Sequence, residues 1–112
     1  MRSFFHAFQG LSTLVATQRN ARIHCVVAVL VGVLGAWLEV SRLEWCLLAL
    51  SIGFVLSAEA LNTGIEFLCD AVHPGHHPLI GKAKDVGAAG VLIAAIAATA
   101  VGVLVFGQRL GG

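Results

Sequence analysis

The sequence predicts an all-α membrane protein, built from an amphipathic helix at the membrane surface followed by three transmembrane helices. Two observations lead to this prediction. First, 58% of the 112 residues are hydrophobic and only 12% are charged, a balance well outside that of water-soluble globular domains. Second, the stretches 23–38, 45–58 and 86–108 contain no Asp, Glu, Lys or Arg. At this length we expect a single domain over residues 1–112.

The N-terminal segment, residues 1–20, has the periodicity of an amphipathic helix. Its large apolar side chains recur at helical spacing, at Phe4, Phe5, Phe8, Leu11, Leu14 and Val15. We expect this helix to lie in the membrane interface, and packing on the other helices is a compatible alternative. Because polar residues interrupt the segment, it lacks the continuous apolar core of a signal peptide, and we expect it to be retained.

The three transmembrane helices are predicted at 21–40, 44–72 and 81–106. A hydrocarbon core of ~30 Å needs about 20 helical residues, so the first two apolar stretches span it only by including polar residues at their ends. The third helix has small residues at four-residue intervals, Gly90, Ala94, Ala98 and Gly102, which allow close helix packing in lipid. Three spans are too few to enclose a site well, so we expect a homo-oligomer.

The basic residues predict the orientation in a cytoplasmic membrane. Most of them lie before or at the start of the first transmembrane helix, or at the start of the third, at Arg2, Arg19, Arg22, Lys82 and Lys84. The N-terminus and the second loop are therefore expected to face the cytoplasm. The seven Lys and Arg residues form no continuous run, so nothing in the sequence indicates a nucleic-acid partner.

The stretch "AEALNTGIEFLCD", residues 58–70, places four polar side chains in an otherwise apolar helix. At 100° per residue, these side chains fall within an arc of roughly 80° on one helix face; they are Glu59, Asn62, Glu66 and Asp70. An aspartate at the centre of a membrane helix costs about 3 kcal/mol, so such groups usually have a function. A polar seam that only holds helices together is the alternative.

These residue types suggest phosphate chemistry at the cytoplasmic end. Asn62 and Glu66, one turn apart, offer the hard oxygen ligands that suit Mg²⁺. Glu59 lies ~10 Å from Glu66 along the helix axis and is free to act as a general base. Lys82, Lys84 and Asp85 open the third transmembrane helix, where lysines suit a phosphate and the aspartate suits a metal.

Two other groups of residues are weaker candidates. The histidines of the second loop, His73, His76 and His77, could bind a transition metal, but no spacing fixes a fourth ligand, so a loop or nucleotide contact is preferred. The three cysteines, Cys25, Cys46 and Cys69, lie in separate apolar segments and are interpreted as small buried hydrophobic residues.

Residues 58–95, "AEALNTGIEFLCDAVHPGHHPLIGKAKDVGAAGVLIAA", resemble the prokaryotic diacylglycerol kinase family. The shared pattern is E-x-x-N-[ST]-x-[IL]-E-x-x-x-D followed by A-K-D, and the similarity extends from Phe8 to Phe106. The stretches "RNARIH" (19–24) and "SRLEW" (41–45) look more like the undecaprenol kinase branch. The resemblance implies a homotrimeric helical bundle in a bacterial inner membrane, with active sites shared between neighbouring protomers.

The resemblance also implies an activity, that of an ATP- and Mg²⁺-dependent lipid kinase. It would transfer the γ-phosphate of ATP to the hydroxyl of a membrane lipid alcohol, and undecaprenol is the expected substrate. The alternative substrate is diacylglycerol, whose phosphorylation gives phosphatidic acid. Two alternatives come from other classes, a small proton-coupled multidrug-type transporter and a non-enzymatic assembly subunit.

The family's functional residues can be carried onto matching positions of this chain. Glu59 would be the catalytic base, Asn62 would help to position it and the γ-phosphate, and Glu66 would bind Mg²⁺. The implied nucleotide-binding residues are Asp70, His77, Gly81, Lys84, Asp85 and Arg22. One position departs from the family, since Gln18 stands where many members have a second metal-binding glutamate. An amide can coordinate through its carbonyl oxygen but adds no charge, which puts a second tightly held Mg²⁺ in doubt.

Overall fold

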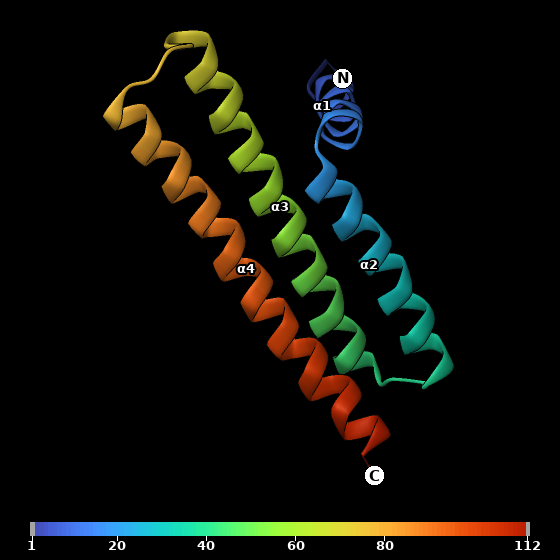
Figure 1. Cartoon of the computed structure of the whole chain (residues 1–112). Helices are drawn as coiled ribbons and strands as arrows, with labels where there is room; N and C mark the ends of the chain where they lie inside the picture. Colours follow the sequence, from blue (N-terminus) through green and yellow to red (C-terminus); the bar gives the residue numbers. More distant parts are fainter. Residues whose placement is uncertain (1, 112) are drawn as a thin grey trace.

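The computed structural model describes residues 2–111 and has four helices in this range: α1 (Arg2–Thr17), α2 (Arg19–Trp37), α3 (Arg42–Val72) and α4 (Pro78–Leu110). Helices α2, α3 and α4 run side by side, whereas α1 lies across their direction (Figure 1). The three long helices are apolar enough and long enough to cross a membrane. The predicted all-α membrane fold is therefore confirmed.

The ends of the helices follow from local capping chemistry. Helix α2 stops at Trp37, three residues before the predicted end, and Glu39 then adopts a left-handed backbone conformation with φ of 53°. Ser41 and Glu44 form a capping box that starts α3 at Arg42, because each side chain satisfies a free backbone N–H of the other. These turn interactions shorten the first span relative to the prediction.

Helix α4 starts at Pro78, earlier than predicted, and runs to Leu110. His77 precedes it, and its Nδ1 accepts a hydrogen bond from the Leu79 backbone N–H at 3.1 Å. Proline suits the first turn of a helix because its missing N–H would have no partner there. The break predicted at "HPGHHP" is thus confined to the short connection 73–77.

Packing is closest between α3 and α4, which form a long hairpin that α2 joins alongside α3. A small apolar core of Val40, Leu48 and Val105 lies near the end of the bundle where α2 connects to α3. At the same end Gly35 packs against the indole of Trp45, and a Cβ there would stand 2.8 Å from Cη2 of the ring. The opposite end holds α1 and the α3–α4 connection (Figure 1).

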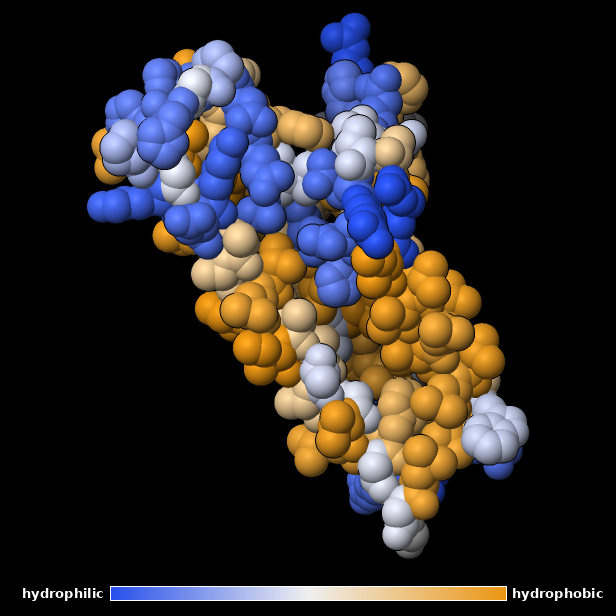
Figure 2. Space-filling model, viewed as in Figure 1, coloured by the Kyte–Doolittle hydropathy of each residue, from blue (hydrophilic) through white to orange (hydrophobic). Residues whose placement is uncertain are grey.

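Apolar side chains cover much of the outer surface of the long helices. Figure 2 shows polar residues gathered at the end that carries α1 and the α3–α4 connection, with a continuous apolar surface over much of the remaining length. The exposed side chains include Val29 and Leu30 on α2, Leu50 on α3 and Leu104 on α4. Surfaces of this extent are expected to face lipid or other chains rather than water.

Candidate active site

Glu59 is the most deeply buried polar residue of α3, with 3% of its surface exposed. Its carboxylate faces α2, where Nε2 of His24 lies 3.3 Å from Oε1. The two groups are close but do not form a hydrogen bond. Oε1 is buried and has no hydrogen-bond partner within residues 2–111. An ionisable group with an unpaired buried oxygen is costly to maintain, which marks Glu59 as a functional candidate.

Asn62 extends from α3 toward α4 and lies beside Gly87. Its Oδ1 is buried and without a hydrogen-bond partner in the described part of the chain. A Cβ at position 87 would overlap this oxygen, so the absence of a side chain on Gly87 makes room for the carboxamide. Glu59 and Asn62 thus lie on adjacent parts of α3, one facing α2 and the other facing α4.

Burial decreases along the predicted polar face toward the α3–α4 connection. Glu59 is buried, Glu66 is half-buried and Asp70 is exposed. Thr63, one turn after Glu59, is also buried at 4% exposure. The face therefore passes from a closed inner part near Glu59 to an open outer part near Asp70, which an extended polar ligand can enter.

The open end of this face meets the start of α4. Nζ of Lys84 donates a hydrogen bond to Oδ1 of Asp70 at 2.6 Å, and both side chains are partly exposed. Lys82 and Asp85 are exposed on the same part of α4, and Gly81 has open space where a Cβ would be. The structure thus brings Asp70 and Lys84 together and leaves Lys82 and Asp85 accessible.

Two of the three loop histidines, His73 and His77, contact each other at the start of α4. His77 caps the helix, and its ring packs edge-on against His73 with the centroids 5.2 Å apart. Within residues 2–111 no group of three or more His, Cys, Asp or Glu side chains is arranged to hold a metal ion. Any metal here would need ligands from a substrate or from another chain.

Gln18 and Arg22 lie at the junction of α1 and α2. Gln18 is the residue between the two helices, and its Nε2 donates to Oγ1 of Thr17 at 3.2 Å. Nη1 of Arg22 donates to the carbonyl oxygens of Val15 and Ala16, at 2.8 and 3.1 Å. Arg22 thereby satisfies free carbonyls at the end of α1 and fixes where α1 lies relative to α2.

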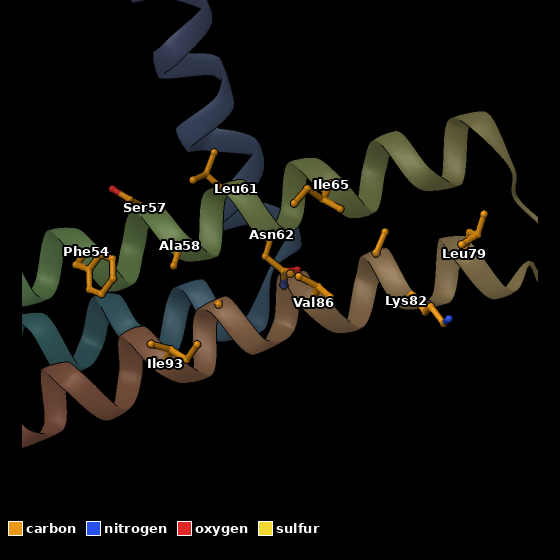
Figure 3. Close-up of a pocket in the computed structure, with 13 residues that line it drawn as sticks. Phe54, Ser57, Ala58, Leu61, Asn62, Ile65, Leu79, Lys82, Val86 and Ile93 are labelled. Carbon is orange, nitrogen blue, oxygen red and sulfur yellow. The ribbon is translucent and has the colours of Figure 1, made fainter.

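An apolar groove of about 850 Å³ runs between α3 and α4 (Figure 3). Apolar side chains such as Phe54, Leu61 and Ile93 form most of its lining, and Asn62 reaches into it from α3. Lys82 lies at the end nearer the α3–α4 connection. A groove with an apolar body and one polar end suits an amphipathic molecule.

The sequence model described as prokaryotic diacylglycerol kinase matches residues 5–106. The chain belongs to this family. It is 38% identical over 109 residues to an undecaprenol kinase of Bacillus subtilis, a match that covers 97% of this chain and 89% of that protein. The chain is therefore a lipid kinase in a membrane, as the resemblance in its sequence implied.

This chain is also similar to diacylglycerol kinases. The protein from Synechocystis is 42% identical over 101 residues, covering 89% of this chain but only 58% of the cyanobacterial protein. The protein from Escherichia coli is 36% identical over 93 residues, covering 83% of this chain and 76% of that protein. The relatives thus include kinases named for each of the two lipids.

Two residues of this lipid kinase's candidate site are not among those predicted from the sequence. One is His24, which lies in the stretch "RNARIH", and a histidine inside an apolar span is itself a signal of function. Gly87 stood among many small residues of the third span, and nothing in the sequence sets it apart. Only the packing of α4 on α3 reveals its contact with Asn62.

Proposed function

We propose that this lipid kinase transfers the γ-phosphate of ATP to the hydroxyl of undecaprenol, in a reaction that depends on Mg²⁺. The observation that carries the proposal is that Glu59 is buried in a membrane helix of a lipid kinase. Its Oε1 has no hydrogen-bond partner in the described chain. Such a carboxylate can take the proton of a lipid hydroxyl where water is scarce.

In the proposed reaction, Glu59 accepts the hydroxyl proton while the lipid oxygen attacks the γ-phosphorus in line. The bond from that phosphorus to the bridging oxygen breaks, and ADP leaves. Asn62 positions the γ-phosphate and the base, whereas Asp70, His77, Gly81, Lys84, Asp85 and Arg22 hold or organise the nucleotide. The protein's contribution is mainly positioning and charge neutralisation, as in other phosphoryl transfers.

The residues near Asn62 fit a magnesium ion. Asn62 Oδ1 is a buried oxygen without a hydrogen-bond partner among residues 2–111, and Glu66, one turn away, is a half-buried carboxylate. With Gln18 and substrate phosphates they would provide the sparse, hard-oxygen ligand set that Mg²⁺ prefers. When bound, the ion would neutralise charge on the phosphates.

Undecaprenol is preferred because the match to the Bacillus subtilis undecaprenol kinase covers nearly the whole of both chains. The groove between α3 and α4 supports a long apolar chain, since its lining is almost entirely apolar (Figure 3). Diacylglycerol is the second candidate, supported by the higher identity to the Synechocystis protein.

We further propose that the protein forms a homotrimer in the bacterial inner membrane, with active sites shared between protomers. Helix α1 and the α3–α4 connection would face the cytoplasm, where ATP is available. In support, both lie at the same end of the bundle (Figure 1). Five of the seven Lys and Arg residues lie in α1, at the start of α2 or at the start of α4, at Arg2, Arg19, Arg22, Lys82 and Lys84, as expected for a cytoplasmic side.

The test is a side-by-side assay of the purified protein with γ-labelled ATP, Mg²⁺, and either undecaprenol or diacylglycerol in mixed micelles. We expect transfer to undecaprenol and near-complete loss in Glu59→Gln. Transfer to diacylglycerol alone would overturn the substrate assignment. A protein that labels no lipid alcohol, or that exports cations in exchange for protons without ATP, would overturn the kinase proposal.

A further inference from the structure

His24 is the polar side chain that approaches the buried oxygen of Glu59. Its Nε2 lies 3.3 Å from Oε1, just beyond the usual range for an N–H···O hydrogen bond. The imidazole side chain is 27% exposed, whereas the carboxylate side chain is 4% exposed. Alignment of the N–H with the oxygen would require the imidazole ring to turn.

The surroundings of the imidazole ring are mainly apolar. His24 lines a second groove, of about 540 Å³, between α2, α3 and α4, together with mainly apolar side chains such as Val27 and Ile52. In an apolar setting a histidine nitrogen that faces a carboxylate carries the proton, because a donor is what the oxygen lacks. The imidazole of His24 can therefore supply the donor that Oε1 of Glu59 lacks.

We propose that His24 is a positioning residue for the phosphoryl transfer. Its Nε2–H donates to Oε1 of Glu59 and fixes the carboxylate, so that Oε2 faces the lipid hydroxyl. This inference rests on the proposed function, because it takes Glu59 as the base.

The proton balance of the step leaves His24 unchanged. The O–H bond of the lipid breaks, its proton goes to Oε2, and the freed oxygen pair forms the new bond to the γ-phosphorus. The phosphorus–oxygen bond to ADP breaks, and ADP leaves with that electron pair. His24 keeps its Nε2 proton throughout and takes none from the substrate.

The first experiment measures kcat and KM of His24→Ala and His24→Gln in the full chain. Loss of orientation lowers kcat of H24A by about tenfold to a hundredfold, since small displacements of a catalytic group cost this much. KM values for ATP and lipid stay near those of the wild type. Glutamine places an amide N–H near the position of Nε2, so H24Q recovers most of the lost kcat.

Val27→Ala serves as the matched control. Val27 lies one turn from His24 on α2 and lines the same groove, so V27A reduces side-chain volume there without removing the donor. We expect wild-type kcat for this variant. A value as low as that of H24A would show that groove packing, not the hydrogen bond, explains the effect.

A double-mutant cycle with Glu59→Asp tests the coupling directly. Aspartate retains a carboxylate base but withdraws it from His24, so H24A should cause little further loss in the E59D background. An equal fold loss in both backgrounds would overturn the proposal, and so would wild-type kcat in H24A or an H24Q no better than H24A. If the wild type phosphorylates no lipid, the proposed function fails as well, whereas an active wild type with an unaffected H24A removes only the role of His24.

Discussion

Gly87 controls the position of the Asn62 carboxamide, because a Cβ there would overlap Oδ1. We expect Gly87→Ala to displace Asn62 and lower kinase activity about tenfold or more, given the cost of misplacing a catalytic group. Gly90→Ala is the matched control, since Gly90 lies one turn later on α4 and has open space at its Cβ position. Both variants gain helix propensity, about 1 kcal/mol each, so a thermal melt separates stability from activity. Equal activity in the two variants would contradict the role of Gly87.

Gln18 offers a second prediction at the scale of a residue. It adds no charge at the position where the family resemblance implies a metal-binding glutamate, and its amide nitrogen donates a hydrogen bond to Oγ1 of Thr17. Replacing it with glutamate adds a hard anionic ligand, so Gln18→Glu should lower the Mg²⁺ concentration that gives half-maximal activity. A titration of activity with Mg²⁺ measures this shift, with Gln9→Glu on the exposed α1 as the control for added charge. An unchanged midpoint would show that position 18 does not bind the metal.

At the scale of the helices, the periodicity of α3 was enough to predict that Glu59, Asn62, Glu66 and Asp70 share one face, because helical geometry fixes the angle between residues on one helix. It could not show which neighbouring helix each side chain meets. That depends on the rotation of α2 and α4 about their own axes, which is set by packing such as Gly35 against Trp45. The contact of His24 with Glu59 depends on the rotation of α2, and the contact of Gly87 with Asn62 depends on the rotation of α4. Neither contact could be predicted from the periodicity of α3.

The α3–α4 hairpin has an ion pair at each end. Arg109 bonds to Glu44, with Nε 3.1 Å from Oε1, and Lys84 bonds to Asp70 at the other end. Arg109→Ala should lower the melting temperature and leave kcat unchanged, because the Glu44 pair lies at the end away from the candidate site. Lys84→Ala should instead abolish most activity through loss of phosphate binding. Arg42→Ala, at the same end as Arg109 but without an ion pair in the described chain, is the control for lost charge. Loss of activity in R109A would contradict this division.

At the scale of the whole molecule, the groups that the proposed reaction needs lie far apart within one chain. Asp70, the partner of Lys84, lies ~16 Å from Glu59 along α3, whereas reacting atoms must come within about 3–3.5 Å of each other. An extended triphosphate can cover part of this distance. The exposed apolar faces of α2, α3 and α4 leave room for a neighbouring chain, whose Lys84 could approach Glu59 from another side.

Mixed oligomers test whether the base and the phosphate-binding lysine come from different chains. Glu59→Gln and Lys84→Ala oligomers should each be nearly inactive alone. When the two chains are refolded together at equal amounts, a site that takes Glu59 from one protomer and Lys84 from the next is intact in about a quarter of cases for random cyclic assembly. We therefore expect roughly a quarter of the wild-type rate in the labelled-ATP assay. If one chain supplied both groups, no mixture could contain an intact site, and the rate would stay at the level of the separate variants.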